Sequence, residues 1–171
     1  MSPKLDSYAL SHPHGLAYHL SAWRNAVEAA YGFKTYCLTA RTGNRISGML
    51  PLVRIKLPLM PGTLVSVPYC DAAGPLADSP KIAQELIFRA LDLARCMNIR
   101  TVSIRSARPM AGIDPETTFN PGKVRMLLPL PDRSDTLLAG LKAKVRSQVK
   151  KPFRDGLTVQ SGGLELLEVF Y

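Results

Sequence analysis

The chain has 171 residues, of which 46% are hydrophobic and 20% charged, a composition that predicts one globular domain with a buried core and excludes a disordered chain. The net charge is +9, but six of the 22 basic residues lie within residues 141–156, and without those six the chain carries 16 basic and 13 acidic residues. A local basic segment of this kind attracts phosphates, anionic lipids or acidic polymers without distinguishing among them.

The cysteines and the N-terminal segment indicate the cellular compartment to expect for the protein. Cys37, Cys70 and Cys96 are odd in number and lack CxxC spacing, which argues against a disulfide framework and a zinc site. The N-terminal segment "MSPKLDSYALSHPHG" has no apolar signal-peptide core. No apolar run approaches the roughly 18 residues of a membrane span. We therefore expect a cytoplasmic protein.

The first elements predicted are a helix and a β-hairpin. Residues 15–32 carry apolar side chains at helical spacing and end at Gly32. Residues 34–56 predict a hairpin, because apolar and polar residues alternate, "TGNR" at 42–45 supplies a turn, and 46–56 forms a longer second strand. Residues 62–75 predict a third strand that runs into a Pro/Gly loop.

A second helix is expected from Pro80 to about Met97. Ser79 or Asp78 can cap its N-terminus, and proline is favoured in a first turn. Three further segments follow it: a strand at 100–106, an irregular loop at 107–122 and a strand at 123–130.

The last long helix includes the basic segment. Ser134 or Asp135 is expected to cap it, and Pro152 is expected to end it near Lys151. A short strand at 156–162 should follow. The whole order predicts an α/β (α+β) fold with a mixed, mostly antiparallel sheet flanked by helices. A doubly wound fold is disfavoured, because a tight hairpin joins the first strands.

Three histidines near the N-terminus raise the question of a metal site. His12 and His14 lie in a Pro/Gly-flanked loop, and neither HxxEH nor HExxH is present. Clustered cysteine or carboxylate partners are also missing. We expect no metal site, and we expect His19 at the helix surface or in one structural hydrogen bond.

Neither Cys37 nor Cys70 is expected to be a nucleophile. Cys37 lies in mid-strand, where a buried inert thiol is ordinary, and Asp71 should raise the pKa of the Cys70 thiol. The phosphate-binding patterns GxGxxG and GxxxxGK[ST] are absent, as is the loop that cradles the coenzyme A pyrophosphate in acetyltransferases. "RTGNRISG" is similar to that loop only in composition, and a hairpin turn explains it better. No motif therefore predicts a bound cofactor.

The segment "SVPYCDAAGPLAD" offers polar groups at the end of a strand. Ser66, Tyr69 and Asp71 supply those groups, and Gly74-Pro75 fixes a turn. One interpretation is a structural loop that leads into the next helix. The other is a binding loop, since functional groups favour loops at strand ends.

Residues 141–156, "LKAKVRSQVKKPFRDG", carry no acid before Asp155. A solvated face is the ordinary interpretation, because the cations flank a narrow apolar seam. Nucleic-acid binding would favour aromatic or amide side chains between the charges, and only Gln148 and Phe153 are available. Membrane-surface binding needs a broader apolar face than this seam. The seam consists of Leu138, Leu141, Val145 and Val149.

Several stretches, in chain order, resemble those of one family: "YHLSAWRNAVEAAYG", "ISGMLPLVRIK", "LVSVPYCDAAGPLAD", "VSIRS", "LLPLPDRSDTLLAGLKAKVRSQVKKPFRDGLTVQSGG" and the final "FY". The chain resembles the FemAB-like branch of the GNAT acyltransferase superfamily. It is most similar to FemAB-related proteins found beside exosortase and exopolysaccharide gene clusters. The resemblance runs from about Leu5 to Tyr171. Its most specific parts are the Trp-to-Tyr-Gly helix, the Leu-Pro-Leu strand, the Ser-x-Pro…Asp…Gly-Pro loop and the Lys-x-Arg…Lys-Lys helix.

The resemblance implies a domain arrangement. Family members resemble two GNAT-like folds in tandem, so residues 1–160 correspond to a GNAT-like N-terminal domain and 161–171 to the start of a second one. We expect a truncated, split or fragmentary member. Its apolar end, "LELLEVFY", should pack against a missing second domain or another chain, since exposed apolar patches usually mark interfaces.

The resemblance also implies transfer of an acyl or aminoacyl group to an amine of a cell-envelope or exopolysaccharide substrate. The donor is left open between acyl-CoA and aminoacyl-tRNA, and no catalytic base is assigned. Cell-wall members bind a precursor phosphate with a basic residue after the first-helix Trp, and Arg24 lies near that position. The alternative is a non-catalytic module whose basic helix, 141–154, docks tRNA, an anionic polymer or a protein. The substrate-binding candidates are Tyr69, Asp71, Arg105, Lys144, Arg146 and Lys150.

Overall fold

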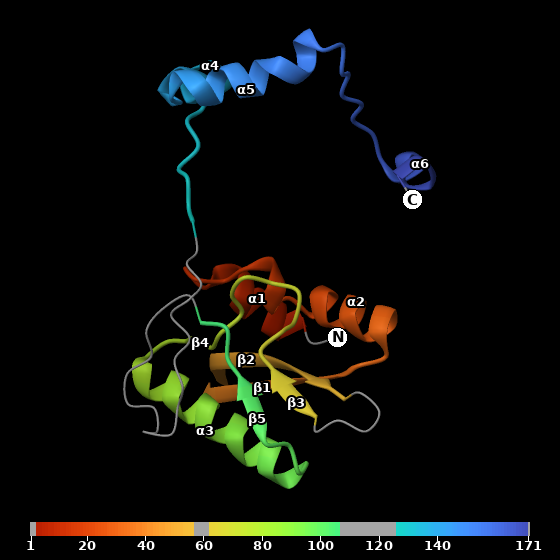
Figure 1. Cartoon of the computed structure of the whole chain (residues 1–171). Helices are drawn as coiled ribbons and strands as arrows, with labels where there is room; N and C mark the ends of the chain where they lie inside the picture. The colour runs from red at the N-terminus through yellow and green to blue at the C-terminus, as the bar shows by residue number, and fades with distance from the viewer. Residues whose placement is uncertain (1–2, 57–61, 107–125, 171) are drawn as a thin grey trace. The chain divides into compact units, whose positions relative to one another are not determined.

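A computed structural model of the chain describes residues 3–56, 62–106 and 126–170. The chain divides into two compact units, Met1–Arg125 and Met126–Tyr171, which are described separately (Figure 1). The domain boundary that the family resemblance implies, at residues 160 and 161, stays a prediction. No helix among the described residues is long and apolar enough to cross a membrane.

The first unit begins with helical segments that the sequence predicts only in part. An unpredicted helix, α1, spans Pro3–Ser11. The helix predicted at 15–32 is two elements, a 3-10 helix η1 at Ala17–His19 and α2 at Ser21–Tyr31, because Leu20 between them has extended backbone. Gly32 ends α2 as predicted: it is left-handed, with φ 66°, and its N–H donates to the Glu28 carbonyl at 2.9 Å.

The sheet is mixed and mostly antiparallel, as predicted, with helices on both faces. Strands β1 (Lys34–Thr42) and β2 (Arg45–Ile55) form the predicted hairpin. Strand β3 (Thr63–Val65) and the short β4 (Leu76–Ala77) both pair antiparallel with β2. Strand β5 (Thr101–Ser103) lies parallel to β3, which gives the order β1-β2-β3-β5.

Strand β2 is the centre of the core, because residues 46–53 are buried on both faces of the sheet. Successive strand residues point to opposite faces. Leu50 and Leu52 pack with the apolar side of α3 (Pro80–Cys96), whereas Met49 packs with Ala9 of α1. Helix α3 therefore covers one face of the sheet, and α1 with α2 lies over the other (Figure 1).

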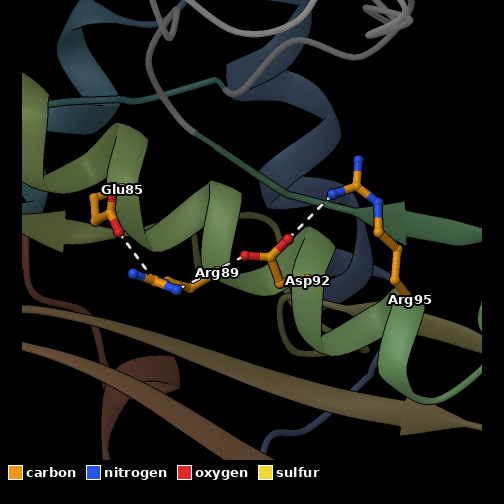
Figure 2. A network of polar contacts seen from close by, with 4 residues as sticks. All are labelled: Glu85, Arg89, Asp92 and Arg95. Atoms are coloured by element: carbon orange, nitrogen blue, oxygen red, sulfur yellow. Dashed lines mark hydrogen bonds and ion pairs between the residues drawn. The ribbon is translucent and has the colours of Figure 1, made fainter.

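Helix α3 starts where the sequence predicts. The Ser79 hydroxyl accepts a hydrogen bond from the Ile82 N–H at 3.4 Å, and Pro80 occupies the first turn. Figure 2 shows the outer side of the helix, where four charged side chains form a chain of ion pairs. The pairs span 2.9 Å from Arg89 to Glu85, 3.9 Å from Arg89 to Asp92 and 3.1 Å from Arg95 to Asp92. Exposed pairs contribute about 0–1 kcal/mol each, so the apolar side of α3 fixes its position.

The second unit contains helices α4 (Ser134–Gly140) and α5 (Ala143–Arg154), then the 3-10 helix η2 (Leu164–Leu166) and α6 (Leu167–Phe170). The single long helix predicted here is wrong, because Leu141 and Lys142 have ψ values of 150° and 146° and interrupt it. The predicted stop near Lys151 is also wrong. Pro152 lies inside α5 near its end, where the missing N–H removes only one helical hydrogen bond.

Two predicted strands are absent from this unit. Residues 126–130 have no regular structure and are exposed, and the same holds for 157–162. The strand prediction at 123–125 and the loop at 107–122 lie outside the described residues. Apolar side chains alone did not produce strands, because a strand also needs a sheet edge to pair with. None of the described residues 126–170 is buried.

Candidate functional site

The loop at residues 66–75, which follows β3, has a strained backbone. Val67 has φ 54° and Tyr69 has φ 61°, so both adopt the left-handed region that side chains disfavour. For the β-branched Val67 this costs on the order of 1–3 kcal/mol. The surrounding packing holds it there, because the Val67 side chain is fully buried against Cys70, Ala73 and the rings of Tyr18 and Trp23.

Arg105, a predicted site residue that follows β5, ties this loop to the sheet. Its guanidinium donates to the Cys70 carbonyl at 2.7 Å, and its backbone N–H donates to the Ser66 hydroxyl at 2.7 Å. The Ala73 N–H in turn donates to the Arg105 carbonyl at 2.9 Å. Arg105 is thus bonded to the start, the middle and the end of the loop, and its charge is used in part to hold the backbone.

Tyr69, the second predicted residue, presents its ring at the surface. The side chain is 55% exposed, and its ring stacks on that of Tyr31 with centroids 4.7 Å apart. Tyr31 stacks in turn on Phe33 at 5.7 Å and an interplanar angle of 13°. We call Phe33, Tyr31 and Tyr69 the aromatic stack. It joins the loop to the end of α2 and the start of β1.

Asp71, the third predicted residue of this unit, is exposed. The sequence places it and Tyr69 on either side of Cys70, whose carbonyl holds the Arg105 guanidinium. The structure therefore brings Tyr69, Asp71 and Arg105 to one loop. A carboxylate and a phenol at the surface, backed by a cation, can accept a hydrogen bond from an amine and donate one to an oxygen.

The Cys70 thiol is unsuited to nucleophilic attack. It is buried and lies 3.1 Å from the Val67 carbonyl, to which it donates. Burial raises the pKa of the Cys70 thiol, and the Asp71 carboxylate raises it further, while Arg105 opposes both. Burial likewise raises the pKa of Cys37. Thiols held protonated in this way are poor nucleophiles.

His19 supports the other end of the loop by structural hydrogen bonding, one of the two roles that the sequence suggested for it. It is buried, not at the surface, and it makes two hydrogen bonds, not one. Its Nδ1 accepts from the Leu16 N–H at 3.1 Å, so the proton resides on Nε2, which donates to the Gly74 carbonyl at 3.0 Å. Burial lowers the pKa of His19. The ring is therefore a neutral structural anchor.

Arg24 and Asp6 extend this anchor to α1. Arg24 is buried, and its guanidinium donates to the His19 carbonyl at 3.1 Å, so in this structure it serves the fold. The Asp6 carboxylate accepts from the Ser21 N–H at 2.8 Å and from the Ser21 hydroxyl at 2.5 Å. Burial acts to raise the pKa of Asp6, but these two bonds and the Arg24 charge leave that pKa below its ordinary value.

The other three predicted residues lie on α5, in the second unit. Lys144 and Lys150 are exposed, and neither has a recorded partner in the part of the chain that the structure describes. Arg146 is half-buried and donates to the Ala139 carbonyl at 3.1 Å and the Leu141 carbonyl at 2.5 Å. Arg146 therefore braces the junction of α4 and α5. The binding roles of all six candidates stay predictions.

The N-terminal histidines form no candidate metal centre. The rings of His12 and His14 contact each other edge to face at 5.6 Å, and the His12 Nε2 lies 3.4 Å from the Ala77 carbonyl. Across the described ranges 3–56, 62–106 and 126–170, no three His, Cys, Asp or Glu side chains gather closely enough to hold a metal ion.

Known structures that match this chain include FemX. The chain is similar to a crystal structure of FemX, at 20% sequence identity and a TM-score of 0.42. The match covers 54% of this chain and 21% of that one, so the chain spans about a fifth of the FemX structure. No protein-family model matches the sequence, and no curated protein matches it significantly.

Proposed function

We propose that this chain supplies one domain of a FemAB-like N-acyltransferase, which moves an acyl or aminoacyl group onto an amine of a cell-envelope or exopolysaccharide substrate. The ordered motifs of the sequence support the proposal, as does the mixed sheet with helices on both faces. The observation that carries it is the strained loop at 66–75, which presents Tyr69 and Asp71 at the surface while Arg105 and His19 hold its backbone. Backbone strain of this kind gathers at binding and catalytic sites.

The reaction needs an amine held against a carbonyl. The amine nitrogen attacks, a C–N bond forms, and the C–O bond of an aminoacyl ester or the C–S bond of an acyl thioester breaks. The proton lost by the amine goes to the departing oxygen or sulfur, which leaves as a hydroxyl or a thiol. In this proposal Asp71 accepts a hydrogen bond from the acceptor amine, and Tyr69 supplies a ring and a hydroxyl beside it. The cations of α5 serve anionic parts of a donor or acceptor.

The remainder of the proposed donor and acceptor site is proposed to come from a second domain or another chain. The apolar end of this chain would form that junction, because Leu164, Val169 and Phe170 are 82%, 86% and 80% exposed. Exposed apolar patches of this kind mark interfaces.

The test is genetic and chemical. Cells are prepared with the gene deleted, with the wild-type gene restored and with Asp71→Asn restored, and envelope precursors are analysed by mass spectrometry for an acyl or aminoacyl addition on an amine. We expect the adduct to vanish on deletion, to return with wild type and to stay at least tenfold lower with Asp71→Asn. Adduct levels unchanged by the deletion would contradict the proposal. Restoration of Asp92→Asn, a substitution in the exposed ion pairs of α3, is the matched control.

A second candidate function is docking of tRNA through α5, independent of catalysis. Two cations on this helix, Lys144 and Lys150, are exposed and have no recorded partner among the described residues. Filter binding with tRNA across a salt series measures the number of phosphates engaged. Each of Lys144→Gln and Lys150→Gln should lower the slope of log K against log salt by about 1. Retention of no tRNA at low salt would exclude this candidate.

A further inference from the structure

A basic hollow lies at the surface where β1 begins and β2 ends, apart from the 66–75 loop. Its volume is about 290 Å³, and no carboxylate of the described residues lines it. Lys34 and Arg54 are directly opposed in the β1–β2 register, and Lys56, just after the end of β2, lines the same hollow. The lining residues are Gly32, Phe33, Lys34, Arg54 and Lys56.

The charges of the hollow are not compensated within the described residues. Like charges directly opposed across two strands repel each other and destabilise the pair. The Arg54 Nε is also buried and has no hydrogen-bond partner among the described residues. The neighbouring acid on α2, Glu28, accepts a hydrogen bond from the Thr35 hydroxyl at 3.3 Å. An anion in the hollow would relieve the repulsion and give the half-buried Arg54 side chain a partner.

The wall of the hollow also carries an aromatic ring. Phe33 lines the hollow and forms one end of the aromatic stack, next to Tyr31 and then Tyr69. Clustered cations beside stacked aromatic rings are the combination that binds a phosphate attached to a flat base, because the cations hold the phosphate and the base stacks on a ring.

We propose that this hollow binds a phosphorylated ligand with a flat ring, of the nucleotide class. Lys34, Arg54 and Lys56 hold the phosphate, and the half-buried ring of Phe33 beside them accepts the flat ring of the ligand. The site goes beyond the proposed acyl transfer and does not depend on it, since binding alone is its function.

The experiment is calorimetric titration of the purified full chain at low salt, with adenosine 5′-monophosphate and ribose 5-phosphate as probes. We expect the nucleotide to bind with a salt-dependent affinity and the sugar phosphate to bind at least several-fold more weakly, since stacking on a base contributes on the order of 1–3 kcal/mol. Equal affinities would overturn the part assigned to the ring. A nucleotide that gives no binding heat and no change in the backbone amide NMR signals of residues 32–34 would overturn the site.

Variants distinguish nucleotide binding in this hollow from a general attraction of anions to a basic chain. Lys34→Gln combined with Lys56→Gln should weaken nucleotide binding about tenfold, because two phosphate contacts are lost. Both side chains are exposed, so the fold should be retained. Arg41→Gln removes an exposed cation at the far end of β1 and should leave binding unchanged. Equal weakening by the double variant and by Arg41→Gln would show a diffuse charge effect and refute the hollow.

Discussion

The Nε2 of His19 donates a hydrogen bond to the Gly74 carbonyl, 3.0 Å away, and so joins the 3-10 helix η1 to the loop that carries Tyr69 and Asp71. The Nδ1 of the same ring accepts from the Leu16 N–H. Both nitrogens are therefore used in the neutral state of the ring. A second proton could enter only at Nδ1, where it would break the bond to Leu16 and place a charge in a buried position.

This arrangement predicts a loss of stability in mild acid. Burial holds the folded pKa of His19 below its ordinary value of 6.5, so the unfolded chain takes up the proton first as the pH falls. The contribution of His19 is then complete above about pH 6.5 and declines below it. Urea unfolding at pH 7.5 and pH 5.5 measures the difference. His19→Gln should lower the free energy of unfolding at pH 7.5 and reduce the difference between the two pH values. His12→Gln is the matched control, and a wild-type difference that survives in His19→Gln would disprove the assignment.

The lowered pKa of Asp6 predicts a second loss of stability, at a more acidic pH than that of His19. The folded pKa of Asp6 is lowered, so its stabilising contribution is present above about pH 3.9, the ordinary value for the unfolded chain, and is lost as the pH falls through the folded pKa. Asp6→Asn should cost about 1.5–3 kcal/mol at pH 7, because two hydrogen bonds from Ser21 to a charged acceptor are weakened.

The check for Asp6 is chemical denaturation of the variant and of Asp92→Asn, whose exposed ion pairs predict a change within about 0.5 kcal/mol. At pH 3 the difference between wild type and Asp6→Asn should shrink. A constant difference from pH 7 to pH 3 would mean that the carboxylate charge contributes nothing.

The sequence predicts the sheet and α3 well because those elements carry local signals. Alternation with "TGNR" marks the hairpin, and Ser79-Pro80 marks the helix start. The same local signals failed at residues 126–130, where an apolar run looks like a strand but has no pairing edge within its unit. Of the site, the loop and Arg105 could be predicted to lie at strand ends. The partners of His19 and Arg24 could not, because they are backbone carbonyls that only the folded chain brings near.

Substitution of Gly48 provides a steric test of the contact between β2 and α3. A Cβ added there would lie 2.7 Å from the Cγ2 of Ile82 and 3.2 Å from the Leu76 carbonyl oxygen. Gly48→Ala should therefore destabilise the fold by about 1–3 kcal/mol. Ile82→Ala removes the closest methyl group, so its own cost should be smaller in the Gly48→Ala background than in wild type.

Thermal denaturation of the two single variants and the double variant measures this coupling. Gly140→Ala is the control, because a Cβ there meets nothing within 4 Å and the residue is helical, so it should be neutral or stabilise by up to about 1 kcal/mol. Additive effects of Gly48→Ala and Ile82→Ala would show that the clash lies instead with the Leu86 Cδ1 at 3.1 Å or the Leu76 carbonyl oxygen at 3.2 Å.

On α5, substitution of Arg146 should change both helix content and tRNA binding, whereas substitution of Lys144 should change tRNA binding alone. The Arg146 guanidinium donates to the carbonyls of Ala139 and Leu141, which lie at the end of α4 and just beyond it. Arg146→Gln should loosen this junction, so that helix content falls as well as tRNA binding, since bonds from a charged donor contribute about 1.5–3 kcal/mol each. Lys144→Gln should weaken tRNA binding and leave helix content unchanged, because Lys144 is exposed. Far-ultraviolet circular dichroism beside filter binding distinguishes the two. Unchanged helix content in Arg146→Gln would mean that its hydrogen bonds do not brace the junction, and Arg146 would then count with Lys144 among the cations that serve a ligand.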